Sequence, residues 1–489
     1  MKPRLFFALL AGFSLSLSAG TLQERILMAD TLIVSPESYT LVNPALAGYR
    51  LPVSISRIDA GFEQQGGVTR RGYFDARTYI QSKNSTIEGH ASYRNGFRLN
   101  SGIYENANPE LLYPYLTADE VGGRLDDEIY SFGGAYNTSL ADSTWLIGVE
   151  GAYTALLECR RRDPRPKNTV GDLNARLGGA FRLGTYWLGA SISGRKYKQT
   201  NDISFVSEIG ESKIYHTIGL GAHYSRFAGS SRNSSYSGSG FGASLNLFPV
   251  ENLGAFASVD FNRFSFNKIL TNLNRLPLAS ANENALSVQA GWRSGNFALS
   301  ANFASSLRKG KENIFGEPMG NVYPEIATLT TFSSRNLRTG ISAAYSLLTY
   351  LTRWSFALEA EYAGNSMKYL GFATPRQMKI NHFTPCLNAQ WVRAISQSVT
   401  LHAGASGMLE LPSSTSLEGV PSERNFMEES ATAEYSWLSA RKGTFGLNIG
   451  IDVNVSRTIA VGVRAAAGQT YIADHNSQTN YNCSICMIF

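Results

Sequence analysis

The sequence predicts an all-β protein, a transmembrane antiparallel β-barrel of about 18 strands with short periplasmic turns and long extracellular loops. Three observations predict it: an alternating apolar strand at the carboxyl end, an export signal at the amino end, and aromatic pairs that recur at a fixed interval. The composition agrees, because a mean hydropathy of -0.15 and 17% charged residues suit a barrel with a polar lumen and an apolar exterior.

The carboxyl-terminal stretch alternates in period two. A strand places alternate side chains on opposite faces, so these positions form one continuous apolar face that ends on an aromatic residue. A membrane barrel ends in this way because its last strand closes the ring and its aromatic end reaches the lipid interface. The pattern resembles the signal that bacterial barrel-insertion machinery reads, although an ordinary edge strand is the alternative. The face comprises Tyr481, Cys483, Ile485, Met487 and Phe489.

The amino end predicts export. Residues 1–20 combine a basic start, an apolar run and a small-residue site, as a secretory signal peptide does. Residues 21–50 are expected to form a periplasmic or lumen segment, and 51–489 the barrel. No stretch after the signal offers the roughly 18 consecutive apolar residues of a membrane helix. An exported chain with a membrane-type strand is therefore expected in the cell outer membrane.

The segment before the barrel ends in an Asn43-Pro44-Ala45 turn. This turn resembles one that fatty-acid-channel-like and type IX secretion-associated barrels carry. A plain turn ahead of the first strand is the simpler interpretation.

In three predicted strands an aromatic residue opens and closes the apolar face, eight residues apart. Eight residues that rise about 3.3 Å each at a tilt of about 40° climb roughly 20 Å. This height is close to the apolar band of about 25 Å between the two aromatic girdles of a membrane barrel. We therefore assign the girdle to Trp145, Tyr153, Trp354, Tyr362, Tyr481 and Phe489.

Short and long connections alternate along the chain. Long polar loops are expected near 100–127, 158–169, 201–235, 269–283, 309–335, 367–377, 412–443 and 472–479. Eighteen strands result if the alternating stretches 213–226 and 428–441 extend strands above the membrane or belong to loops; otherwise the count is 16 or 20. No convincing amphipathic helix is expected.

One predicted outer loop is strongly basic and contains two prolines. Clustered guanidinium groups can fork onto phosphate or carboxylate, so the loop is a candidate site for an anion or for lipopolysaccharide. A generally basic surface that faces an anionic leaflet is the alternative. The loop contains Arg160, Arg161, Arg162, Arg165 and Lys167.

A second candidate set lies on the inward face of predicted strands. These side chains can line a charged lumen or constriction. A mutually paired network inside the barrel is the alternative, because charges there need partners. The set is Glu88, His90, Arg94, Glu150 and Arg176.

Catalytic and metal-binding patterns are weak. The six histidines are scattered, and His475 beside Asp474 is the nearest approach to a catalytic pair. Cys483 and Cys486 would point to opposite faces of a strand, which is unsuitable for a shared metal. The net charge of +6 is too mild to indicate nucleic acid. We therefore predict no enzymatic activity, no cofactor, no metal site and no nucleic-acid partner.

Several runs resemble a family. Leu112-Tyr113-Pro114-Tyr115, the segment 128–136, the loop 162–168 and the segment 309–314 are similar to an uncharacterised outer-membrane β-barrel family of Bacteroidota, domain of unknown function 6850. The resemblance implies a barrel, often encoded near TonB-linked receptors and surface lipoproteins. It implies no substrate and no functional residues.

The predicted function is a channel or transport-associated barrel, porin-like, with an unknown solute. The alternative is an accessory or structural barrel that partners a TonB-linked receptor, a surface lipoprotein or a secretion machine through its outer loops. Outer-membrane lipid and lipopolysaccharide are the expected surroundings. A TonB-dependent receptor itself is disfavoured, because about 470 mature residues leave no room for 22 strands and a plug domain.

Overall fold

The structure is a computed structural model. The predicted signal peptide and most of the segment 21–50 lie outside the residues that it describes, so both assignments stay predictions. The described residues are 26, 43–49, 53–66, 68–99, 103–140, 143–207, 211–227, 233–251, 253–320, 322–349, 351–421 and 425–489.

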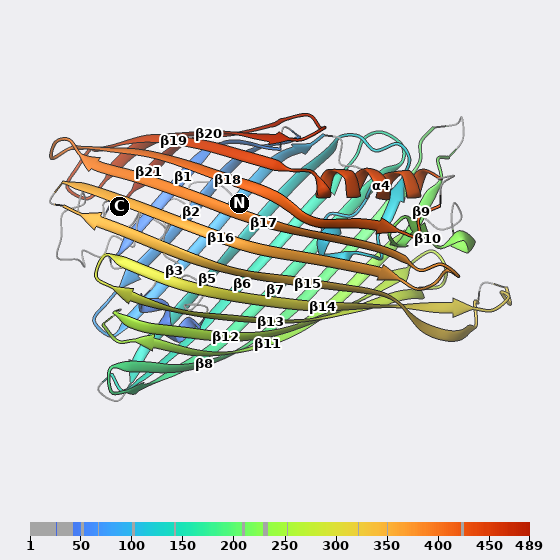
Figure 1. Ribbon diagram of the computed structural model, residues 1–489, viewed down its shortest axis with the longest axis horizontal. Coiled ribbons are helices and arrows are strands. Elements are labelled where there is room, and N and C mark those ends of the chain that lie inside the picture. Colours follow the sequence, from blue (N-terminus) through green and yellow to red (C-terminus); the bar gives the residue numbers. More distant parts are fainter. Residues whose placement is uncertain are drawn as a thin grey trace, which may run out of the picture.

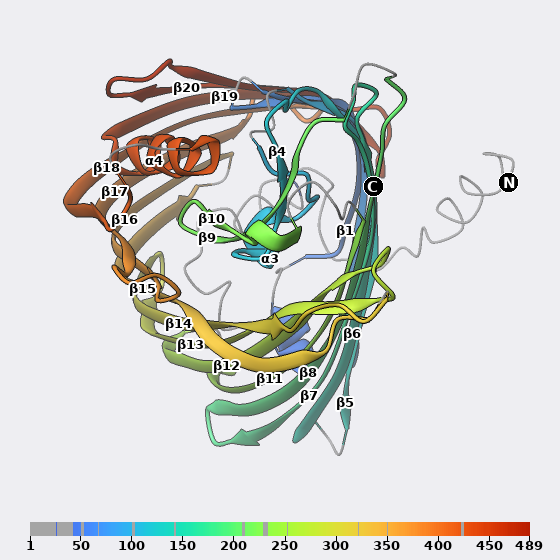
Figure 2. The ribbon, with the colours of Figure 1, turned by 90° about the vertical axis from the view of Figure 1, so that its right-hand side faces the viewer.

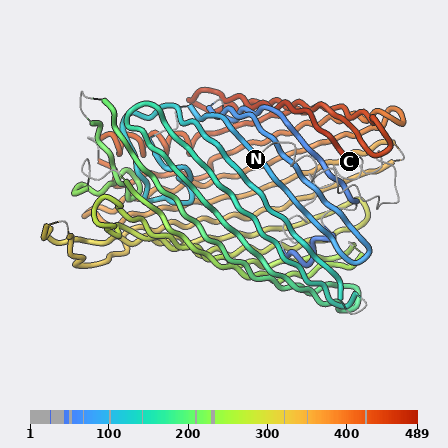
Figure 3. Tube along the Cα trace, turned by 180° about the vertical axis from the view of Figure 1, so that it is seen from behind, coloured from blue at the N-terminus to red at the C-terminus, as the bar shows by residue number. Residues whose placement is uncertain are grey.

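The described chain forms one closed antiparallel sheet of 18 strands. The strands run obliquely around this single-layered ring (Figures 1 and 3). Strand β1 pairs with β2 on one side and with β21 on the other, and this last pairing closes the ring. The predicted fold class and strand number are confirmed. The strands are β1 (Ile55–Gln65), β2 (Thr69–Gln81), β3 (Ser85–Arg98), β5 (Leu125–Leu140), β6 (Trp145–Cys159), β7 (Arg165–Leu183), β8 (Tyr186–Ser204), β11 (Ser234–Pro249), β12 (Gly254–Leu270), β13 (Leu276–Ser294), β14 (Phe297–Phe315), β15 (Glu325–Leu348), β16 (Thr352–Tyr369), β17 (Arg376–Ala394), β18 (Val399–Glu418), β19 (Lys442–Asn454), β20 (Ala460–Ile472) and β21 (Gln478–Ile488).

Side chains alternate between the lumen and the exterior along these strands. On β21, Tyr481, Ile485 and Met487 are exposed on the outside, whereas Ser484 and Cys486 are buried on the inside. The same alternation leaves large apolar side chains exposed around the ring, among them Trp145, Leu177, Ile192, Leu245, Ile341, Leu358 and Ile449. The apolar face predicted for the last strand therefore points away from the lumen.

The two ends of the barrel differ. At one end, the turn end, the chain makes short connections such as 184–185 and 295–296. At the other, the loop end, lie the long connections 99–124, 205–233 and 419–441. Several stretches expected as loops are instead continuous strand, and β15 runs for 24 residues. The ladder between β14 and β15 continues there as far as Phe315 and Glu325, although the side chains are polar.

Two long connections fold inward and form a plug (Figure 2). We use this word for residues 103–124 and 211–227. The plug holds helix α3 (Pro109–Leu112), strands β4 (Thr117–Asp119), β9 (Ile214–Gly219) and β10 (Ala222–His223), and the turn η4 (Ser225–Phe227). Strands β4, β9 and β10 make a small sheet. The stretch 213–226 therefore belongs to an inward loop, one of the two options that the sequence left open.

The stretch 428–441 lies in the long connection between β18 and β19, again one of the options that the sequence left open. Most of it is helix, which corrects the expectation of no convincing amphipathic helix. Helix α4 (Phe426–Ser439) packs against β17 and β18. A capping box begins it, since the Asn425 side chain accepts from the Glu428 N–H while the Glu428 carboxylate accepts from the Asn425 N–H. No helix within the described part of the chain is long and apolar enough to cross a membrane.

Candidate functional site

A hydrophobic core joins the plug to the barrel wall at the loop end. From the plug it takes Leu112, Tyr115, Leu116, Ile218, Leu220 and Ala222, all buried. From the wall it takes Val170, Tyr197, Tyr236, Phe266, Ala279, Ala281, Phe332, Tyr369, Met378 and Ile380. A closed barrel leaves its inner face to water unless other groups cover it. Here the inward loops fill that space.

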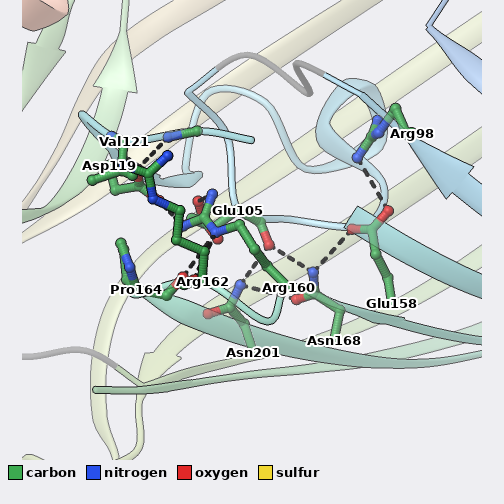
Figure 4. A network of polar contacts seen from close by, with 11 residues as sticks. Arg98, Glu105, Asp119, Val121, Glu158, Arg160, Arg162, Pro164, Asn168 and Asn201 are labelled. Atoms are coloured by element: carbon green, nitrogen blue, oxygen red, sulfur yellow. Dashed lines mark hydrogen bonds and ion pairs between the residues drawn. The ribbon is translucent and has the colours of Figure 1, made fainter. Parts of the chain in front are cut away.

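A buried arginine fixes the first half of the plug (Figure 4). The Arg160 guanidinium forms ion pairs with Glu105, at 2.8 Å, and with Asp119. Its Nε donates to the Pro164 carbonyl at 2.8 Å. All three charged side chains are almost fully buried. We call these three residues the latch, because two come from the plug and Arg160 follows β6 of the wall.

Neutral polar groups hold the same part of the plug. The side-chain amides of Asn168 and Asn201 both donate to the Glu105 carbonyl, at 2.6 and 2.9 Å. Asn168 also contacts Glu158, which pairs with Arg98 at 3.1 Å. A buried backbone carbonyl is costly unless it is hydrogen-bonded, so these amides stabilise the inward path of the loop.

Two further cations reach the plug from the wall. The Lys268 ammonium is fully buried, donates to the Leu116 carbonyl at 2.6 Å and lies 5.8 Å from the centre of the Tyr236 ring. Arg308 pairs with Glu283 and donates to the carbonyls of Glu110 and Tyr113, at 2.9 and 2.8 Å. The plug is therefore attached to β6, β12 and β14 by charged donors.

The two latch carboxyl groups differ in proton affinity. Burial, followed by the neighbouring Asp119, raises the pKa of Glu105 well above its usual range, and Arg160 only partly opposes this. Burial opposes the ionisation of Asp119, but hydrogen bonds from Glu105, Arg160 and the Gly122 N–H outweigh it and lower the pKa of Asp119. When the latch takes up a proton, these opposite shifts direct it to Glu105, whereas Asp119 keeps its charge beside Arg160.

These shifts predict a pH dependence of the plug. Glu105 binds its proton more tightly in the folded state. Its contribution to the stability of the plug is therefore full below its ordinary pKa of 4.5 and is lost as the pH rises through its raised pKa. The contribution of Asp119 is full above its ordinary 3.8 and is lost as the pH falls through the lowered value. We expect hydrogen exchange of 103–119, corrected for intrinsic rates, to be slowest near pH 4–5 and to quicken toward alkaline pH. Glu105→Gln should abolish the alkaline acceleration; an unchanged profile would exclude Glu105 as the cause.

A cavity of about 700 Å³ lies beneath the plug. Tyr104, Tyr113 and helix α4 line one side of it, and inward residues of β12 to β17 line the other. Its lining mixes apolar and aromatic side chains with serines, asparagines, Arg308 and Arg338, as ligand sites do. We call this space the chamber.

At the turn end the segment 43–49 occupies a socket on the inner wall. The Asn43 amide donates to the carbonyls of Gly179 and Ala190, both at 3.2 Å, and the segment continues as the turn η3 (Pro44–Tyr49). Leu46 packs with Trp187, Phe248 and Phe256. The socket depends on glycine, because a Cβ at Gly148 would lie 2.4 Å from the Pro44 backbone carbon.

The five predicted anion-binding residues are not brought together. Arg160 is buried in the latch, where carboxylates already occupy it, and Lys167 is exposed on the outer face of β7. Arg161, Arg162 and Arg165 do line one open cleft of about 610 Å³ at the loop end. Arg161 contacts Asp126 at 3.2 Å, and Arg165 contacts Asp163 at 2.6 Å. Anion binding by these three remains a prediction.

The predicted lumen residues share the inner face of the wall. Arg94 pairs with Asp75 at 3.1 Å and with Glu63 at 3.6 Å, and Arg176 lies 4.0 Å from Glu150. Glu88 and His90 lie on the same inner face of β3, opposite Ala135 and Gly133. Arg94, Glu150 and Arg176 thus lie in ion pairs, as the paired alternative would have them, whereas the role of the full set of five remains a prediction.

The six predicted girdle residues all lie on outward positions. Trp145, Trp354 and Phe489 lie at the turn end, each eight residues from its partner Tyr153, Tyr362 or Tyr481. Trp354 also contacts Trp391 of the next strand, with ring centroids 6.1 Å apart. Their assignment to a lipid interface remains a prediction.

The cysteines are free, with Cys483 exposed outside and Cys486 buried inside. Across the described residues no group of three or more His, Cys, Asp or Glu side chains is arranged to hold a metal ion.

Sequence reasoning missed Glu105, Asp119, Lys268, Arg308 and Arg338. One signal was available. Residues 111–116 read Leu-Leu-Tyr-Pro-Tyr-Leu, an apolar run inside a stretch expected as a polar outer loop. Such a run needs a covered position, and the lumen supplies it.

The fold and the site define a closed 18-stranded β-barrel whose own loops plug its lumen. The chain belongs to the family of unknown function DUF6850, whose model matches residues 54–489. This confirms the predicted family, whereas its bacterial group remains a prediction.

No curated protein matches the chain in sequence. Among solved structures, the chain is similar to the ferric preacinetobactin receptor BauA of Acinetobacter baumannii, with 10% identity over 89% of this chain and 80% of the receptor and a TM-score of 0.43. It is also similar to the FrpB iron transporter of Neisseria meningitidis, with 9% identity, coverage of 89% and 81%, and a TM-score of 0.40. A third similar structure is the copper transporter OprC, with 8% identity over 89% of this chain and 80% of the transporter and a TM-score of 0.40.

Proposed function

We propose that the protein resides in the bacterial outer membrane. Its outward apolar side chains support this, because water-soluble monomers rarely expose contiguous apolar patches beyond a few hundred Å². The predicted export signal and girdle agree with it. A protein of this kind resists extraction until detergent is added and shifts on gels with heating. Amino-terminal sequencing of the mature protein, expected to start near Thr21, tests the export step.

An outward arginine tests the lipid-facing surface. Ile192 on β8 is 63% exposed, and arginine at the middle of a membrane barrel costs about 2–4 kcal/mol on its lipid face. We expect Ile192→Arg to lower the unfolding free energy in lipid vesicles by that amount. The matched Ser193→Arg, one residue along and facing the lumen, should cost much less. Equal effects of the two substitutions would argue against a lipid face.

Within that membrane we propose a transport-associated barrel whose passage is closed by its own plug in this state. The observation that carries the proposal is the chamber beneath a plug that a hydrophobic core and buried polar groups attach to the wall. Such a plug covers a ligand-sized space and no disulfide bond ties it to the wall, so its displacement can connect the loop end to the lumen. The solute's path would follow the paired charges of β1 to β8, which suit a hydrated lumen.

Planar-bilayer conductance tests this function. The wild-type barrel is expected to remain almost silent. A variant in which a Gly-Ser linker of equal span replaces residues 103–119 should conduct steadily. Large steady conductance of the wild type would contradict closure by the plug. Silence of both proteins would favour the accessory role.

One observation favours that accessory role. Residues 325–330 of β15 pair with β14, but no described strand pairs with their other edge, because β16 begins its pairing at Phe332. Ile326 and Leu329 of this edge are exposed, as are Leu370 and Phe372 in the next connection. A free edge with apolar neighbours can accept an extended segment of a receptor, lipoprotein or secretion component.

Shortening the hairpin of β14 and β15 distinguishes the accessory role from the transport role. Replacing residues 313–328 by a two-residue turn removes most of the free edge, namely residues 325–328. If the accessory role holds, a partner that co-purifies with the wild type should be lost while the barrel still folds. Retention of the partner would show that the edge does not recruit it.

The cleft of Arg161, Arg162 and Arg165 supports a further part of the proposal, contact with lipopolysaccharide phosphates. Arg162→Gln should weaken binding of purified lipopolysaccharide. Lys167→Gln, on the neighbouring outer face, is the matched control.

A further inference from the structure

The inner wall of the chamber is built in rows across neighbouring strands. Strand register places Ser287, Ala304, Arg338, Ala363 and His382 in one row from β13 to β17. Directly opposite residues of an antiparallel sheet share a face, so these five side chains lie side by side on the lumen side. All five line the chamber.

Arg338 has space on both sides in this row, because its direct neighbours Ala304 and Ala363 are small. Within the described residues it forms no ion pair. The other arginine of the chamber is different, since Arg308 is engaged by Glu283 and by two carbonyls of the plug. Arg338 therefore presents an available guanidinium fork to the chamber.

The carboxyl groups that line the chamber do not neutralise the charge of Arg338. Glu434 of α4 accepts a hydrogen bond from the Tyr104 hydroxyl at 3.3 Å, and burial raises the pKa of Glu434. Glu110 of α3 also lines the chamber, but it forms no ion pair with Arg338. The Arg338 guanidinium is exposed to the chamber, so an anion that enters can reach it directly and form a charge-assisted forked contact.

The next row toward the loop end supplies amides. Asn365 donates to the Asn336 side-chain oxygen at 2.6 Å, and Asn336 donates to Ser306 at 3.3 Å. The Asn365 oxygen is buried and accepts no hydrogen bond from any described residue. Asn365 lies diagonally across from Arg338, within reach of one small molecule. Ile380, which lies opposite Asn365, and the neighbouring Met367 and Leu438 provide an apolar surface.

We propose that the chamber binds a small amphipathic anion, with its carboxylate or phosphate on Arg338 and its apolar body against Met367, Ile380 and Leu438. The inference rests on the proposed transport function and names the class of molecule that the barrel would carry. The two rows of wall residues account for the charged and the apolar part of this ligand. Arg338, between two alanines, binds the charged group, and Met367, Ile380 and Leu438 cover the apolar body.

Equilibrium binding to the purified full-length barrel in detergent tests the proposal. The probes are phenylacetate, phenyl phosphate and the neutral phenylacetamide. At least one acid should bind, and phenylacetamide should bind more weakly. Arg338→Gln should weaken binding of the acid by roughly tenfold or more, because a charge-assisted forked contact is lost. Arg338→Lys should recover part of the affinity, because it keeps the positive charge. Arg335→Gln, on the outer face of the same strand, is the matched control and should bind as the wild type does.

Equal affinity of the wild type and Arg338→Gln would overturn the assignment of Arg338. Equal affinity for the acid and the amide would overturn the ligand class, and so would the absence of binding of either acid to the wild type. The heat-dependent gel shift reports folding of each variant. Because binding is measured without permeation, failure here is distinct from failure of the conductance experiment.

Discussion

Replacement of Arg160 by methionine is expected to release the first half of the plug. The substitution keeps a long side chain but leaves Asp119 buried without a cation, with only Glu105 and the backbone N–H groups of Val121 and Gly122 beside it. Breaking a buried ion pair by removing one partner costs about 3–5 kcal/mol. Hydrogen exchange of residues 103–119 should therefore quicken by roughly a hundredfold or more. Exchange in the strands at the turn end should not change.

The matched control for this substitution is Arg161→Met. The Arg161 side chain is 90% exposed, and it pairs with Asp126 at the surface. Such pairs contribute about 0–1 kcal/mol, so exchange in the plug should hardly change. Equal exchange in the two variants would mean that Arg160 does not hold the plug. The hydrophobic core would then be its main attachment.

Replacement of Gly148 by alanine is expected to expel the segment 43–49 from its socket. The new Cβ would lie 2.4 Å from the Pro44 backbone carbon and 2.5 Å from the Ala45 nitrogen. These are backbone atoms, so a side-chain rotation cannot relieve the contact. Expulsion removes the buried Leu46 from its cluster, a loss worth about 2–5 kcal/mol by itself. The two hydrogen bonds of Asn43 are lost with it.

Exchange of the amides in 43–49 measures this effect directly and should approach that of an unprotected peptide. Gly194→Ala on β8 is the matched control, because a Cβ there meets nothing within 4 Å. Protection that persists in Gly148→Ala would show that the wall moves to accommodate the methyl group.

The barrel was predictable because alternation is local. Trp145, Ile147 and Val149 lie on one face by geometry alone, whatever the rest of the chain does. The plug was not predictable in this way. Its attachments join residues far apart in sequence, such as Lys268 to the Leu116 carbonyl and Arg160 to Glu105. Only the apolar run at 111–116 indicated that this loop needed cover.

Two errors have physical causes. The stretch 428–441 alternates imperfectly, and the capping box at Asn425 together with packing on β17 and β18 favours a helix. The basic loop with Arg160, Arg161, Arg162, Arg165 and Lys167 was interpreted from charge alone, and charge alone does not show that one of its members is buried. Burial of one member, Arg160, between two carboxylates depends on where the plug lies, and sequence spacing does not report that.

The claim that lipid surrounds this barrel underlies the transport and accessory proposals alike. Spin-label accessibility along β7 tests it most directly, after the free cysteines at 159, 386, 483 and 486 have been replaced. The barrel is labelled at one position at a time, from Asp172 to Leu177, and placed in lipid vesicles. The accessibility of successive labels should then alternate between lipid and water. Leu173, Ala175 and Leu177 should collide with dissolved oxygen, and Asp172, Asn174 and Arg176 with a water-soluble nickel chelate. Collision with the nickel chelate at all six positions would contradict the account.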